Sequence, residues 1–324
     1  GHLSSALAGS TGVNRGPDAL QSRVSGVDEP DRRIDISYGD VEEVLEHGDA
    51  SQRSLGYRLL GWCAKPDAVR ALTANLDHEV GSVRESRREA VDDALGIVEC
   101  SVRGNGNLSP KEAFVSLSEL YAFDDTDVDR SVLEQARDAL FDELTNTDSE
   151  PDELLRATGR LAREDTEFAQ SLVSESIQSL TESSEDPIVG WDVLRAVAKW
   201  EPESVVGRSD DLIAVLATSQ PEETRKALLV LSTVAERTRS VTTDLAEVAV
   251  RELNADEAEV VLEAIRAVEQ IGFHPPPQEL VRLSKGRGRA ASAAEEAMET
   301  LLDDRRGNAS SYARDLESDD REVA

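Results

Sequence analysis

The residues best suited to hold a charged ligand lie in one basic stretch near the end of the chain. Residues 271–290 read IGFHPPPQELVRLSKGRGRA and contain four basic residues against a single acid. The basic residues are Arg282, Lys285, Arg287 and Arg289. Cationic side chains, together with backbone N–H groups at the start of a helix, can bind phosphate or another anion. These four positions are therefore a candidate site for an anion or for a binding partner.

The same stretch has two other interpretations. In the first it is only a connection, in which prolines end one helix, Leu280 and Leu283 lie on a short helix, and glycines turn the chain into the last helix. In the second it binds nucleic acid, together with Arg84, Arg87 and Arg88. The chain has a formal net charge of −31, and four cations in one loop fall short of a nucleic-acid footprint. Connection is therefore favoured over anion binding, and nucleic acid is least favoured.

Two tryptophans form a second candidate surface. Trp191 and Trp200 bracket the helix expected over residues 187–200, in a chain whose aromatic content is only 4%. A tryptophan in a partner groove often dominates binding energy. The alternative is that these side chains are wedged between neighbouring helical hairpins. Both residues are kept as candidate partner contacts.

An acidic segment has the beginning of a calcium loop. Asp125, Asp127 and Asp129 have the right spacing, but Arg130 replaces the glycine and Ala136 the final glutamate that such a loop needs. We interpret this segment as the start of a helix, where acids face the positive end of the helix dipole.

The other residue types that could do chemistry are scattered. None of the histidines has the spacing of a metal pair, and no nucleophile motif is present. The histidines are His2, His47, His78 and His274. Cys63 and Cys100 make no metal or redox pattern, and we expect both to be buried free thiols because they lie in apolar helical runs. The sequence therefore predicts no enzyme activity, no cofactor and no metal.

The elements that must position these residues are predicted to be helices throughout. Apolar residues recur with i, i+3, i+4, i+7 spacing, as at Ala169, Leu172, Val173, Ser176, Ile177 and Leu180. Prolines stand where helices should begin, at Pro66, Pro110, Pro151, Pro187, Pro202 and Pro221. Helix pairs begin near residues 151, 187, 221, 256 and 289, a step of about 35 residues that is typical of stacked helical hairpins.

One segment resembles a known repeat family. Residues 51–98 read SQRSLGYRLLGWCAKPDAVRALTANLDHEVGSVRESRREAVDDALGIV, with Leu60–Gly61 ending a first helix and Val83–Arg84 restarting the pattern. This is similar to HEAT-like repeats in the short form found in bilin lyases. The resemblance implies an all-α, HEAT/armadillo-like α-solenoid of about six to eight helical hairpins.

The predicted organisation is a single array between two polar ends. Residues 1–37 are expected to be a flexible arm, residues 38–304 the repeat array, and residues 305–324 a polar tail. Residues 103–109 interrupt the regular step after a long helix, and could bend the array or divide it.

Composition points to a salt-rich environment. The chain has 66 acidic and 35 basic residues spread along its length, with a pI of about 4.4. Evenly spread acidity resembles that of halophile proteins, in which carboxylates hold water and cations at molar salt. No stretch is apolar enough for a membrane span, so a cytoplasmic location is expected. The sequence favours a non-enzymatic scaffold that binds an unidentified protein partner, with nucleic acid or phosphate binding by the basic loop as the alternative; the oligomeric state stays open.

Overall fold

A computed structural model describes residues 38–74, 81–122, 128–146, 151–182, 187–238, 241–273 and 276–302. Within these ranges the regular secondary structure is helical and no strand occurs. The chain forms two compact units that divide between Glu164 and Asp165. The predicted arm at 1–37 and tail at 305–324 lie outside the described residues, as do His78, His274, Asp125 and Asp127.

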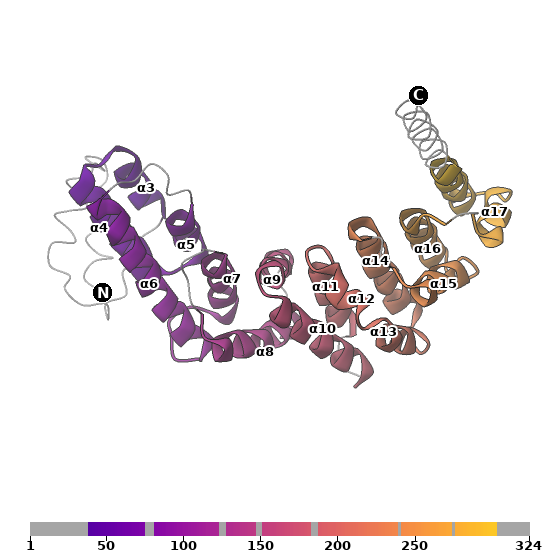
Figure 1. Cartoon of the computed structure of the whole chain (residues 1–324), viewed down its shortest axis with the longest axis horizontal. Coiled ribbons are helices and arrows are strands. Elements are labelled where there is room, and N and C mark those ends of the chain that lie inside the picture. The colour runs from indigo at the N-terminus through magenta and orange to yellow at the C-terminus, as the bar shows by residue number, and fades with distance from the viewer. Residues whose placement is uncertain are drawn as a thin grey trace, which may run out of the picture. The chain divides into compact units, whose positions relative to one another are not determined.

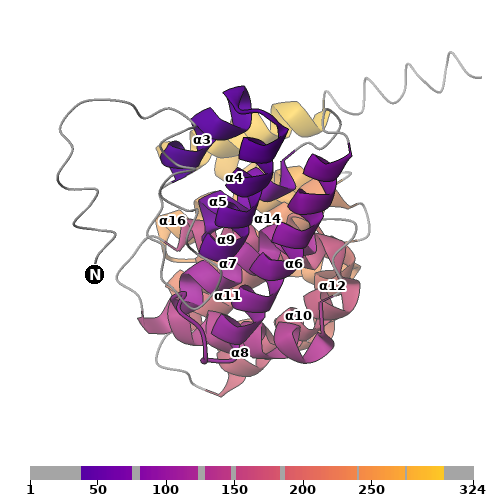
Figure 2. The same cartoon turned by 90° about the vertical axis from the view of Figure 1, so that its left-hand side faces the viewer.

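The first unit is built from helices that pack on their neighbours in the chain (Figure 1). Its helices are α3 (Tyr38–His47), α4 (Ala50–Cys63), α5 (Pro66–Thr73), α6 (Ser82–Val102), α7 (Pro110–Tyr121), α8 (Arg130–Asn146) and α9 (Asp152–Glu164). One row consists of α5, α7 and α9, with α7 in contact with both of the others. A second row consists of α4, α6 and α8, and in Figure 2 α4 and α6 are seen lying along one another.

The second unit repeats this two-row packing. Its helices are α10 (Thr166–Thr181), α11 (Pro187–Ala198), α12 (Pro202–Val206), α13 (Ser209–Leu216), α14 (Pro221–Arg237), α15 (Thr243–Glu252), α16 (Ala258–Ile271) and α17 (Gln278–Ser284), followed by helical residues 289–302. One row is α11, α14 and α16, and the other is α10, α13 and α15. Short α12 contacts α10, α11 and α14.

Helix starts follow the predicted proline and cap signals. Proline occupies the first helical turn of α5, α7, α12 and α14, and α11 also begins at a proline. The Ser109 hydroxyl accepts a hydrogen bond from the Glu112 N–H, and the Glu112 carboxylate accepts one from the Ser109 N–H. This reciprocal cap satisfies two N–H groups that α7 itself cannot pair. Starts at residues 152, 187, 221, 258 and 289 confirm the predicted step closely.

The predicted apolar stripes form the cores of the rows. In α10 the stripe from Ala169 to Ile177 is buried, and in α16 Val261, Ala264, Ile265 and Val268 are buried. Each buried Leu, Ile or Val side chain contributes about 1.5–3 kcal/mol relative to its exposed state. Because one hairpin has no second layer of its own, this burial depends on the neighbouring helices of the row.

A glycine sets the distance between α4 and α6. A Cβ added at Gly61 would lie 2.5 Å from the carbonyl oxygen of Ala90 and 2.9 Å from its Cα. Any side chain at position 61 would therefore force the two helix backbones apart.

Two predictions about local structure are wrong. Cys63 is half-buried and Cys100 is exposed, although both were expected to be buried. On α6 the buried stripe runs through Ala94, Val98 and Ser101, and Cys100 points away from it. The prolines do not end α16: Gly272 does so, with a left-handed φ of 75°. In the part of the chain that the structure describes, no helix is both long and apolar enough to cross a membrane.

Candidate functional site

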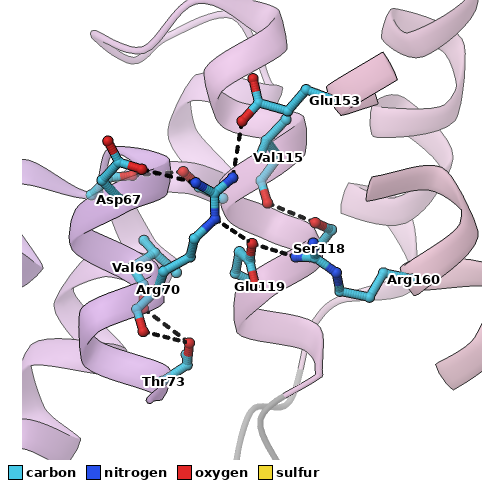
Figure 3. Close-up of polar contacts among 11 residues, drawn as sticks. Asp67, Val69, Arg70, Thr73, Val115, Ser118, Glu119, Glu153 and Arg160 are labelled. Atoms are coloured by element: carbon cyan, nitrogen blue, oxygen red, sulfur yellow. Dashed lines mark hydrogen bonds and ion pairs between the residues drawn. The ribbon is translucent and has the colours of Figure 1, made fainter. Parts of the chain in front are cut away.

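A network of ion pairs joins the three helices of the first row in the first unit. Each member is charged and contacts an opposite charge on its own or another helix of the row. Figure 3 shows the contacts of Arg70 and the pair formed by Glu119 and Arg160. The members of this α5–α7–α9 network are Asp67 and Arg70 on α5, Lys111 and Glu119 on α7, and Glu153 and Arg160 on α9.

Arg70 is the centre of the network. Its guanidinium donates from Nε to Glu119 Oε1 at 2.8 Å and from Nη2 to Glu153 Oε1 at 2.9 Å. A third bond runs from Nη1 to Asp67 Oδ1 at 2.8 Å within α5. The planar fork of arginine has the donor geometry that holds several carboxylates at once, which lysine lacks. One side chain thereby links α5 to both α7 and α9.

Glu119 is the most shielded member. Its side chain is 13% exposed, against 41% for Arg70, and it also pairs with Nη1 of Arg160. Lys111 Nζ lies 3.8 Å from Glu153 Oε2, which closes a second link between α7 and α9. Since three cations face three anions, the network is charge-balanced on a strongly acidic chain.

The network raises the pKa of Arg70 above its ordinary value. The hydrogen bond to Glu119 is the largest cause; partial burial opposes it, and the hydrogen bond to Glu153 adds to it. Arg70 therefore stays charged at every physiological pH. Exposed ion pairs contribute about 0.2–1 kcal/mol each, so we assign most of the stabilisation to the shielded Arg70–Glu119 pair.

The second unit has a smaller charge-balanced surface on α11 and α14. Lys226 Nζ donates to both oxygens of Asp192, at 2.7 and 2.9 Å, and both side chains are about three-quarters buried. By sequence, α11 and α14 each carry as many basic as acidic residues, whereas α10 and α13 carry acids alone. The row that contains α11 and α14 is therefore less acidic than the row behind it.

The four predicted basic residues do not act alike. Arg282 on α17 donates to Oδ1 of Asn254, and Arg289 Nη1 lies 3.2 Å from Glu259 Oε1. Lys285 and Arg287 are exposed and contact no partner among the described residues. The structure thus supports the connecting role for the outer two residues and leaves the inner two available.

Burial separates the two predicted tryptophans. Trp191 is 1% exposed in the core of the second unit, so its side chain is removed from the candidate partner surface. Its position matches the alternative interpretation, a tryptophan wedged between packed helices. Trp200, just beyond α11, is 48% exposed and remains accessible.

One of the three arginines proposed to assist nucleic-acid binding is buried. Arg87 is 2% exposed, donates to the carbonyl oxygens of Leu72 and Ala74, and stacks 5.3 Å from the ring centre of Tyr57. It holds the end of α5 against α6, so it cannot contact a ligand. Arg84 and Arg88 are exposed on α6 of the first unit.

The described part of the acidic segment is a helix start. Asp129 Oδ1 accepts a hydrogen bond from the Ser131 N–H at 2.9 Å, and this bond lowers the pKa of Asp129 below its ordinary value. Within the described ranges, no three His, Cys, Asp or Glu side chains gather closely enough to hold a metal ion.

An open pocket of about 430 Å³ lies between the helix ends of the second unit. It is lined by the end of α15 and by the turns before α14 and α16, including Ser219, Arg251, Glu252, Asp256 and Glu257. Arg251 Nε pairs with Glu252 Oε1 at 2.9 Å, so the one cation in the lining is already neutralised. The pocket is therefore acidic and has no arrangement suited to binding an anion.

Comparison with known proteins adds little to this geometry. No family model matches the chain, and no curated protein sequence matches it. Among solved structures, the crystal structure of an engineered protein aligns over 81% of this chain and 95% of its own, with 16% sequence identity and a TM-score of 0.37. A likeness at that score carries no argument about fold or function, so the described features define an all-α protein and no narrower class.

Proposed function

We propose that this chain is a non-enzymatic adaptor, a HEAT-like α-solenoid that binds a protein partner on the row of α5, α7 and α9. The observation that carries the proposal is the α5–α7–α9 network. It balances three cations against three anions on a chain of net charge −31, so a partner would meet no local excess of negative charge at the network. The central contact is that of Arg70 on α5, which forms hydrogen bonds to both α7 and α9.

The network supports binding by preorganisation. Arg70 links α5 to α7 and to α9, which adds polar links to their apolar packing, so little ordering remains to be done when a partner binds. Every charge in the network already faces a counter-charge, which suits a fixed surface better than a general acid or base. This is why we favour recognition over catalysis for these residues.

We further propose that the adaptor works in a salt-rich cytoplasm. Its 66 acids repel one another in dilute buffer, and this repulsion is screened over about 3 Å at 1 M salt. The unfolding temperature should therefore rise steadily between about 0.1 and 2 M KCl. A temperature that is flat or falls over this range would contradict the proposed environment.

Affinity capture from the source cells at molar KCl tests the adaptor proposal. The bait variant Arg156→Glu reverses an exposed charge on α9, where Arg156 is 75% exposed and makes only a long contact with Asp152. The control Arg84→Glu makes the same charge change at an exposed position of α6. We expect a stoichiometric partner with the wild-type and control baits and its loss with Arg156→Glu. Equal capture by all three baits, or capture of no protein, would refute binding on this row.

A further inference from the structure

The basic loop after α17 is held at both ends by one turn. Arg282 donates to Asn254, which follows α15, and Arg289 pairs with Glu259 in the first turn of α16. Both contacts therefore reach back about thirty positions, one to the turn between α15 and α16 and the other to the start of α16. The segment between them, residues 283–288, is thereby linked to its neighbours at both ends without using Lys285 or Arg287.

The inner two cations are presented outward. Lys285 and Arg287 are exposed, alternate with Gly286 and Gly288, and have no partner in the described ranges. Gly288 has a φ of 99°, a left-handed conformation that a side chain would strain. The loop shape is thus encoded by glycine, and the two cations are the only side chains between Ser284 and Arg289.

We propose that Lys285 and Arg287 form a docking site for a short acidic segment of a partner protein, in which two carboxylates pair with the two cations. Side chains two residues apart in an extended peptide lie on the same side and are spaced by about 7 Å. Two acids with this spacing lie on one side of the segment, so both are available to the two exposed cations. This inference does not depend on the α5–α7–α9 row, which lies in the other unit.

The surroundings favour a short acidic segment over nucleic acid. The turn that anchors the loop carries Asp256, Glu257 and Glu259, and Arg289 neutralises only the last of these. A phosphate backbone extends its charge evenly and would be repelled beyond the two free cations. A peptide can instead carry basic residues beside its acids, and the acids of this region would attract these basic residues. The expected motif is therefore an acidic pair flanked by basic residues.

Nuclear magnetic resonance of the full chain can test this site at the weak affinity expected for two exposed ion pairs. Amide signals of Gly286 and Gly288 report on the loop, and Gly104, a glycine of the first unit, serves as the reference. The probes are the peptide KSDSDSK, its amide counterpart KSNSNSK, and a short single-stranded DNA. Titrations run in about 0.15 M KCl, where screening beyond about 8 Å suppresses the repulsion from distant acids.

The variant Lys285→Gln/Arg287→Gln removes both free cations, and Arg84→Gln/Arg237→Gln removes two other exposed cations as a matched control. We expect KSDSDSK to shift the loop glycines and not Gly104, with a Kd about three- to tenfold weaker in the loop variant and unchanged in the control.

Four results would overturn the proposal. Equal shifts with KSNSNSK would remove the carboxylates from recognition, and equal weakening in the control variant would reduce the effect to net charge. Tighter binding of DNA than of peptide, lost in the loop variant, would assign the loop to nucleic acid. Loop signals that do not move with any probe would leave Lys285 and Arg287 without this role.

Discussion

Replacing Arg70 by methionine should destabilise the first unit by about 2 kcal/mol. Methionine keeps the apolar stem and removes three hydrogen bonds. The bond to Asp67 is a helix i, i+3 pair worth about 0.3 kcal/mol, and the half-exposed bond to Glu153 adds about 0.5. Because the Glu119 side chain is only 13% exposed, the Arg70–Glu119 bond should supply the remaining ~1 kcal/mol.

A double-mutant cycle isolates that last contribution. Arg70→Met, Glu119→Gln and the combined variant should show a coupling energy of about 1 kcal/mol. A chain with two units is expected to unfold in more than one step, so global unfolding would not give this coupling energy. Hydrogen exchange followed by mass spectrometry on peptides from α5 and α7 measures the coupling energy within the first unit. About half of the coupling or more should persist in 2 M KCl, since water and ions reach Glu119 poorly.

The matched control is Arg137 and Asp138 on α8. Their side chains are 2.7 Å apart, but Asp138 is 65% exposed, so a coupling of about 0.3 kcal/mol or less is expected. If the Arg70–Glu119 coupling is no larger than this control, the network does not hold the row together. The preorganised surface proposed for α5, α7 and α9 would then lose its physical basis.

Three further predictions concern single residues of the first unit. Arg87→Met should lower the free energy of unfolding, measured in urea, by about 3 kcal/mol. Arg87→Lys should lower it nearly as much, because lysine lacks the fork that reaches both carbonyl oxygens at the end of α5. A lysine variant as stable as the wild type would contradict this role of Arg87. Gly61→Ala should lower the free energy of unfolding by about 2–3 kcal/mol, because an added Cβ at position 61 meets the Ala90 backbone. Gly96→Ala on α6 should raise it by about 0.5–1 kcal/mol, because an added Cβ there meets nothing. Equal effects of the two substitutions would disprove the close approach of α4 and α6. Because the pKa of Asp129 is lowered, its stabilisation of α8 is present above the unfolded-state pKa and is lost as pH falls through the folded-state pKa. The amide signal of Ser131 should therefore titrate in the wild type and not in Asp129→Asn. Titration of this signal in both proteins would mean that another group causes it.

The helices and their starting points could be predicted because their signals are local. Proline in the first turn and the Ser109 cap act within four residues, and the apolar stripe of α10 spans few turns. The exposure of Cys100 was also encoded locally, since it lies off the stripe of Val98 and Ser101. An apolar run alone does not show which of its residues are buried, because burial depends on helical phase.

The candidate site could not be predicted in the same way. Arg70 pairs with residues 49 and 83 positions away, and these contacts exist only once α5, α7 and α9 are packed together. On a chain with charges everywhere, sequence spacing gives no reason to choose Glu119 over other acids. The signal that could have helped is a charge placed directly beside buried positions, as Glu119 lies between buried Ser118 and Leu120.

The ion pair between Asp192 and Lys226 limits how similar neighbouring hairpins can be. The two residues are 34 positions apart, the same step that separates Pro187 from Pro221, so they occupy equivalent places on α11 and α14. A freshly duplicated hairpin would place the same residue at both, and two aspartates or two lysines there would repel one another. The two residues at this position must therefore differ in charge for α11 and α14 to stack. This requirement gives a physical reason why the helices repeat at a regular step although their residues do not match.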